Sequence, residues 1–245
     1  MQGSLLSLTP LIQVSMDIEH VRSRFIKHFD GKTGNIYASP GRINLIGEHT
    51  DYNGGFVFPG AVDKGIMAEV RPNGTDTVMC YSIDLKDRVE FKVTDPEGPH
   101  TSWAKYIYGI VQEMRKLGVD VKGFNTAFSG DVPLGAGMSS SAALESCFAF
   151  ALNDLFGDNK IAKWDMVLAG QATEHNYVGV KCGIMDQFAS VFGKENLNNV
   201  KIVSSSNVVT SNFSSTDSNF EKDRKDIIDL YEKFKKYFLF YYSKI

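Results

Sequence analysis

The sequence is short of cysteine, has no surplus of basic residues and contains no long hydrophobic run. Its three cysteines, Cys80, Cys147 and Cys182, are widely spaced and include no C-x-x-C pair, which argues against a structural metal site and favours a reducing, cytoplasmic compartment. The formal net charge of −3 gives no electrostatic support for nucleic-acid binding. No uninterrupted apolar run approaches the roughly 18 residues that a membrane span needs. We therefore expect a soluble cytoplasmic protein that binds neither nucleic acid nor membranes.

Glycine and proline are absent after Glu195. All 22 glycines and all 7 prolines precede Asn196, and residues 196–220 are dominated by Ser and Asn. That composition is typical of a linker, which we expect to be disordered. In the tail over 221–245, apolar residues at helical spacing predict an amphipathic helix within 221–238.

The start of the chain needs a separate interpretation. Residues 1–15 are uncharged and mildly apolar. A secretory signal begins with a basic region, which this segment lacks. We therefore interpret 1–15 as a non-structural extension and Met16 as a candidate for the true start.

Between these ends the hydrophobic pattern changes repeatedly between helical and strand periodicity. Helices are expected over 16–30, over 102–117, from about 140 to 155, over 164–177 and over 183–193. Strands are expected over 36–38, 65–70, 76–82, 88–93 and 124–128. Because strands and helices mix without strict βαβ alternation, the expected fold class is α+β rather than a doubly wound fold.

A glycine-rich loop precedes the expected helix near 140. Gly135 and Gly137 allow positive φ and close approach of a ligand, and three serines, 139–141, supply hydroxyls and helix-capping groups. A loop of this kind at a helix N-terminus favours anions, because free N–H groups and the helix dipole point at the ligand. The functional interpretation is a phosphate-binding loop, although not a Walker A loop, since no Gly-Lys-Ser/Thr follows. The alternative is a flexible loop before a capped helix.

A second polar cluster lies between two apolar stretches. Arg42, Glu48, His49 and Asp51 concentrate hydrogen-bonding groups within ten residues, which suits a polyhydroxylated ligand such as a sugar. A divalent metal is the rival ligand, but this spacing matches no standard metal site. A solvated polar turn remains the third interpretation.

Two further carboxylates are candidates for chemistry. Asp186 lies among apolar residues, where a charge is expensive unless it is paired, and Arg42 is its natural partner. Such a pair would keep Asp186 ionised and able to orient or deprotonate a hydroxyl, whereas the alternative is a helix N-cap or a buried structural Asp. Glu174 could hold Mg²⁺ together with a loop serine and phosphate oxygens, or could be an ordinary surface residue.

Two aromatic residues, Trp103 and Tyr106, could enclose an adenine, with core packing as the alternative.

The phosphate loop, the sugar-like cluster and the apolar-embedded Asp186 occur in one chain. Together they point to phosphoryl transfer onto a hydroxyl, a reaction in which the protein mostly positions groups and neutralises charge.

Three stretches of the chain resemble the galactokinases of the GHMP sugar-kinase family. Residues 41–55 (GRINLIGEHTDYNGG) are similar to the galactokinase signature, 133–144 (PLGAGMSSSAAL) to the family's ATP phosphate loop, and 182–188 (CGIMDQF) to the stretch with its catalytic aspartate. The resemblance covers about 16–195. It implies the family's α+β architecture, with an N-terminal lobe of the ribosomal protein S5 domain 2-like type, and a monomer that takes galactose, ATP and Mg²⁺.

The resemblance also implies residue roles. Asp186 would be the catalytic base or hydroxyl-orienting carboxylate, and Arg42 would stabilise the transition state. The implied galactose-binding residues are Glu48, His49, Thr50, Asp51 and Gly183. The implied ATP-binding residues are Gly135, Ala136, Gly137, Met138, Ser139, Ser140 and Ser141, with Ser82 and Trp103 near the adenine. The implied Mg²⁺ ligands are Ser141 and Glu174.

The resemblance stops near Glu195, and the later residues contain no third glycine-rich motif. We therefore expect a galactokinase N-terminal lobe whose C-terminal lobe is missing or replaced, which puts turnover in question. The alternatives are an inactive fragment and a non-catalytic galactose/ATP sensor. The intact Ser141-Ala142-Ala143 counts against the sensor, and a kinase for another sugar is a lesser rival.

Overall fold

The computed structural model describes residues 17–44, 47, 49–53, 55, 57–132 and 137–193, and the backbone of 197–204 and 207–214. Several expectations lie outside these residues. They are the extension over 1–15, the helix over 221–238, and the site candidates Glu48, Gly135 and Ala136.

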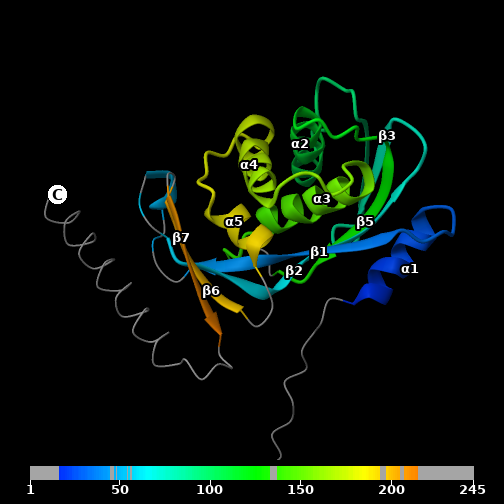
Figure 1. Cartoon of the computed structure of the whole chain (residues 1–245). Helices are drawn as coiled ribbons and strands as arrows, with labels where there is room; N and C mark the ends of the chain where they lie inside the picture. Colours follow the sequence, from blue (N-terminus) through cyan, green and yellow to red (C-terminus); the bar gives the residue numbers. More distant parts are fainter. Residues whose placement is uncertain are drawn as a thin grey trace, which may run out of the picture.

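A five-stranded mixed sheet forms the centre of the fold (Figure 1). Its spatial order is β1 (Asn35–Asn44), β2 (Pro59–Pro72), β5 (Phe124–Gly130), β3 (Thr77–Ser82) and β4 (Asp87–Lys92). The pairs β1–β2, β2–β5 and β3–β4 are antiparallel, whereas β3 and β5 are parallel. A register shift between Pro40 and Arg42 marks an irregularity in β1, immediately before the residue that reaches the site.

Helices cover the two faces of the sheet unequally. Figure 1 shows four of them on one face and α1 (Ile18–His28) on the other. The four are α2 (Ser102–Lys116), α3 (Ser140–Phe156), α4 (Lys163–Thr173) and α5 (Met185–Phe192). Strand alternation supplies both cores: Ile66 and Ala68 of β2 belong to the large core under the four helices, and Met67 belongs to the small core under α1.

The structure confirms the α+β class and the helices and strands expected from periodicity. Three elements differ in detail. β1 continues through Pro40 and Gly41 to Asn44, and β2 begins at Pro59, well before the strand expected over 65–70. The helix expected to reach 177 is α4 followed by a π-helical turn, η2 (Glu174–Val178). Single π turns are common at functional sites, and this one begins at a candidate site residue.

The segment expected to be a disordered linker contains a hairpin. β6 (Leu197–Ser204) and β7 (Asn207–Ser214) pair antiparallel, so the linker expected over 196–220 is replaced by strands over most of its length. The Ser/Asn content obscured a run of β-branched residues, 200–203 and 208–210 being rich in Val, Ile and Thr, which favours extended backbone. Within the described part of the chain, no helix is long and apolar enough to cross a membrane.

The large core depends on Phe148. This side chain on α3 is fully buried and packs against the rings of Phe124 and Phe128, at centroid distances of 6.2 and 6.1 Å. We expect Phe148→Ala to lower the free energy of unfolding by about 3–5 kcal/mol, because it removes a buried ring and leaves a cavity. Urea denaturation followed by circular dichroism measures this. The exposed Leu85→Ala is the control, expected within about 0.5 kcal/mol of wild type, and a Phe148→Ala protein as stable as this control would contradict the expectation.

Candidate active site

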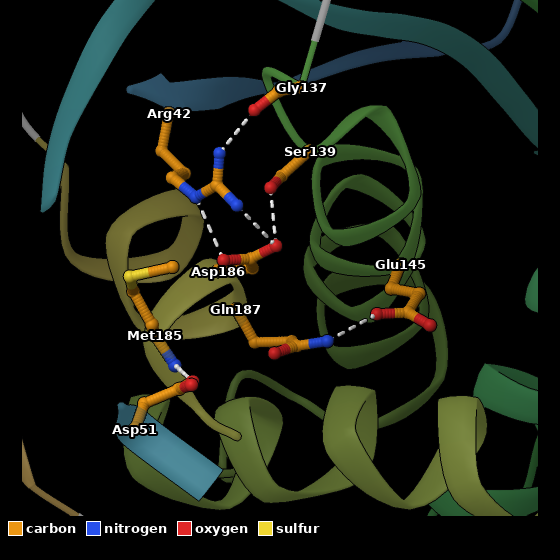
Figure 2. Close-up of polar contacts among 8 residues, drawn as sticks. All are labelled: Arg42, Asp51, Gly137, Ser139, Glu145, Met185, Asp186 and Gln187. Carbon is orange, nitrogen blue, oxygen red and sulfur yellow. Dashed lines mark hydrogen bonds and ion pairs between the residues drawn. The ribbon is translucent and has the colours of Figure 1, made fainter. Parts of the chain in front are cut away.

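The centre of the site is an ion pair between Arg42 on β1 and Asp186 on α5. Arg42 donates from Nε to Oδ1 at 2.8 Å and from Nη2 to Oδ2 at 2.9 Å, which is a bidentate arrangement (Figure 2). The Arg42 side chain is buried, while that of Asp186 is 29% exposed. The pairing inferred from the sequence is therefore present, and Ile184, not Asp186, is the N-cap of α5.

The glycine-rich loop closes around this pair. Arg42 donates from Nη1 to the Gly137 carbonyl and from its backbone N–H to the Met138 carbonyl, the latter at 3.0 Å. Ser139 donates its hydroxyl to Oδ2 of Asp186. These contacts bring the loop, strand β1 and helix α5 to one point.

Backbone conformation makes these loop contacts possible. Ser139 is the N-cap residue of α3, yet it has φ +53° and its hydroxyl makes no capping bond, because it is turned to Asp186. Gly41 lies on strand β1, and a β-carbon there would lie 2.5 Å from the Met138 carbonyl oxygen of the loop. Only glycine allows this approach.

Asp51 and Gly183 lie together beside the start of α5. Asp51 is buried in the turn η1 (Asp51–Asn53), and its Oδ2 accepts a long 3.5 Å hydrogen bond from the Met185 N–H. A β-carbon at Gly183 would overlap the Asp51 carboxylate. Burial raises the pKa of Asp51, the negative charge of Asp186 adds to this, and backbone hydrogen bonds from Tyr52 and Met185 oppose it.

His49 and Thr50 occupy the same turn. His49 has φ +63°, its Nδ1 lies 2.6 Å from the Tyr52 hydroxyl, and its carbonyl accepts from Asn53 Nδ2 at 2.8 Å. The Thr50 hydroxyl donates to the Gly47 carbonyl at 2.6 Å. These bonds order the turn that holds Asp51.

Glu174 is not a surface residue. It lies at the start of η2, is 5% exposed and accepts a hydrogen bond from the Ser141 side chain. Burial raises its pKa, the charge of Asp186 adds to this, and the Ser141 bond opposes it. A carboxylate beside a hydroxyl is an oxygen donor set that fits Mg²⁺, which takes few protein ligands and otherwise water and phosphate oxygens. Among the described residues, no group of three or more His, Cys, Asp or Glu could hold a metal ion.

Ser82 and Trp103 are both neighbours of Phe128. The backbone of Ser82 pairs with Phe128 across β3 and β5, and the Trp103 ring is 5.4 Å from the Phe128 ring. Trp103 donates from Nε1 to Asp87 Oδ2 at 2.9 Å. Trp103 therefore packs against the core, as the alternative to an adenine contact expected. An adenine contact for Ser82 and Trp103 stays a prediction.

The structure adds two residues that sequence reasoning missed, Glu145 and Gln187. Glu145 on α3 is fully buried, and its Oε2 accepts a 3.1 Å hydrogen bond from Gln187 Nε2 (Figure 2). Burial raises the pKa of Glu145 well above its usual range, and the charges of Glu174 and Asp186 act in the same direction. A signal was present, because Glu145 follows Ala142-Ala143-Leu144 and so met the criterion that singled out Asp186, a carboxylate in apolar surroundings.

Two family models match the chain. The galactokinase galactose-binding signature matches residues 23–72, and the GHMP kinases N terminal domain matches residues 105–194. Curated relatives include the galactokinase of Roseiflexus sp. (strain RS-1), 41% identical over 179 residues, and that of Clostridium tetani, 38% identical over 185 residues. These alignments cover 73% and 75% of this chain and 46% and 47% of the relatives. The chain thus spans about half the length of the curated relatives it matches.

Solved structures agree with these matches. The crystal structure of Lactococcus lactis galactokinase complexed with galactose aligns with a TM-score of 0.71 and 30% identity, over 82% of this chain and 57% of that chain. Methanococcus jannaschii mevalonate kinase aligns with a TM-score of 0.60 and 17% identity, over 74% of this chain and 56% of that chain, and shows the shared fold alone. The chain therefore belongs to the galactokinases of the GHMP kinase family and contains the family's N-terminal domain.

Proposed function

We propose that this protein transfers the γ-phosphoryl group of ATP to the anomeric hydroxyl of galactose. The observation that carries the proposal is the Arg42–Asp186 pair, which is bonded directly to the glycine-rich loop through Gly137 and Ser139. In phosphoryl transfer the acceptor hydroxyl must lose a proton while charge spreads over the transferred group. Asp186 orients the hydroxyl and accepts its proton, and Arg42 offsets negative charge beside it.

The other candidate residues take supporting roles in the same proposal. Glu48, His49, Thr50, Asp51 and the Gly183 backbone bind galactose hydroxyls, and residues 135–141 bind the ATP phosphates. Ser141 and Glu174 hold Mg²⁺, which neutralises phosphate charge when bound. Ser82 and Trp103 lie near the adenine. Residues 16–195 form the N-terminal lobe of a cytoplasmic monomer.

A second candidate is binding of galactose and ATP without transfer. In this candidate the matched region, about half of each relative, binds both ligands. Calorimetric titration with galactose and with MgATP separates the candidates. Binding without ADP release supports the second, and ADP release supports the first.

Asp186→Asn tests the catalytic carboxylate. The amide keeps the shape of the side chain but cannot accept the proton, so we expect ADP release in a coupled assay to fall by roughly 10²–10⁴-fold. Leu85→Ala, at an exposed position, should retain wild-type turnover. An Asp186→Asn protein as active as this control would exclude Asp186 as the base.

Gly183→Ala tests the galactose pocket. The added methyl group overlaps the Asp51 carboxylate, so Asp51 must move. We expect galactose affinity to fall by roughly tenfold or more while MgATP affinity changes little, as measured by calorimetry. Gly60→Ala is the matched control, because a β-carbon there meets only Ile43 Cγ1 at 4.0 Å. Equal galactose affinity in the two variants would contradict the assignment.

Glu174→Gln tests the metal role. The amide keeps the Ser141 neighbour but removes the negative charge that favours a dication. The Mg²⁺ concentration for half-maximal ATP binding is expected to rise by roughly tenfold. If Mg²⁺ titrations of wild type and Glu174→Gln coincide, Glu174 is not a ligand.

A further inference from the structure

Glu145 is a fully buried acid that the proposed reaction does not use. It lies on α3 one turn beyond Ser141, so the helix that carries it begins at the glycine-rich loop. Its Oε1 has no hydrogen-bond partner among the described residues. A charged carboxylate in that position would be costly, and burial together with the charge of Glu174 raises the pKa of Glu145 well above its usual range. Burial at this position therefore favours the protonated form of the side chain.

The partner of Glu145 is the residue that follows Asp186. Gln187 is 1% exposed and donates from Nε2 to Glu145 Oε2 at 3.1 Å. Its side chain is also hydrogen-bonded to the Cys182 thiol. Figure 2 shows Gln187 reaching to α3 while Asp186, one position earlier, reaches to Arg42 and Ser139. Successive residues of α5 thus attach to both sides of the loop–helix junction.

Helix α4 packs against both Glu145 and Gln187. A β-carbon at Gly170 would lie 2.6 Å from Gln187 Cγ and 3.3 Å from Glu145 Oε2. The backbone of α4 at Gly170 therefore lies against both side chains and leaves no room for a β-carbon. A packed contact of this kind transmits small displacements, because protein interiors are close-packed.

We propose that Glu145 is a positioning residue, whose contact with Gln187 fixes the Asp186 carboxylate relative to the helix that begins at the phosphate-binding loop. The expected effect on catalysis rests on the proposed function. The contact between Glu145 and Gln187 joins α3 to α5 whether or not the protein catalyses phosphoryl transfer. Glu145 touches neither substrate, and it acts through Gln187 on the residue next to it.

The test compares Glu145→Leu with Glu145→Gln. Leucine fills a similar volume without the hydrogen bond, whereas glutamine still offers an oxygen to Gln187 and bears no charge. For Glu145→Leu we expect kcat to fall by roughly tenfold or more with both KM values within about twofold, because misplacement of a reacting group affects the transition state most. Glu145→Gln is expected to retain kcat within about twofold.

Glu69→Leu is the matched control. Glu69 is also fully buried, but it accepts from the Gly34 N–H at 2.6 Å and pairs with Arg22 on α1. Its loss is expected to lower Tm and leave kcat unchanged. The proposal is overturned if Glu145→Leu behaves like this control, or if Glu145→Gln is as impaired as Glu145→Leu.

Hydrogen exchange keeps the inference testable without turnover. If the wild-type protein releases no ADP, the proposed function fails, but the positioning contact is still measured by amide exchange over 185–192. In Glu145→Leu we expect faster exchange there, with exchange over 102–116 in α2 unchanged, and protection restored in Glu145→Gln. Unaltered exchange over 185–192 in Glu145→Leu would overturn the inference.

Discussion

The bidentate contact between Arg42 and Asp186 is the interaction on which the site depends. A buried guanidinium is costly unless a carboxylate and further acceptors satisfy it. Asp186 and the Gly137 carbonyl do so here, and the Met138 carbonyl accepts from the Arg42 backbone N–H. Satisfying one arginine thus fixes three elements that are far apart in sequence: strand β1, the glycine-rich loop and helix α5.

Three further acidic side chains surround this pair. Burial raises the pKa values of Asp51, Glu145 and Glu174, and Asp186 contributes to each shift. One arginine cannot offset four carboxyl groups. The arrangement suits the proposed reaction, in which a dication would arrive with the nucleotide.

The sequence predicted those features that depend on interactions between residues close together in the chain. Helical spacing predicted α1, in which Val21 and Phe25 are buried, and the glycine–serine run predicted the loop and the start of α3. The polarity of Asp186 within an apolar stretch predicted a paired carboxylate, and Arg42 is its partner. The hairpin over 197–214 was missed because Ser and Asn content outweighed the β-branched residues between them.

The sequence by itself determined most of the helices and strands, the three motif stretches and the family, because periodicity, glycine placement and residue order are properties of short segments. Only the tertiary structure decided that Ser139 turns from helix capping to Asp186, that Glu174 is buried against Ser141, and that Glu145 holds Gln187. These contacts join residues far apart in the chain. Their existence depends on how helices pack on one face of the sheet, and no pattern within a single segment contains that information.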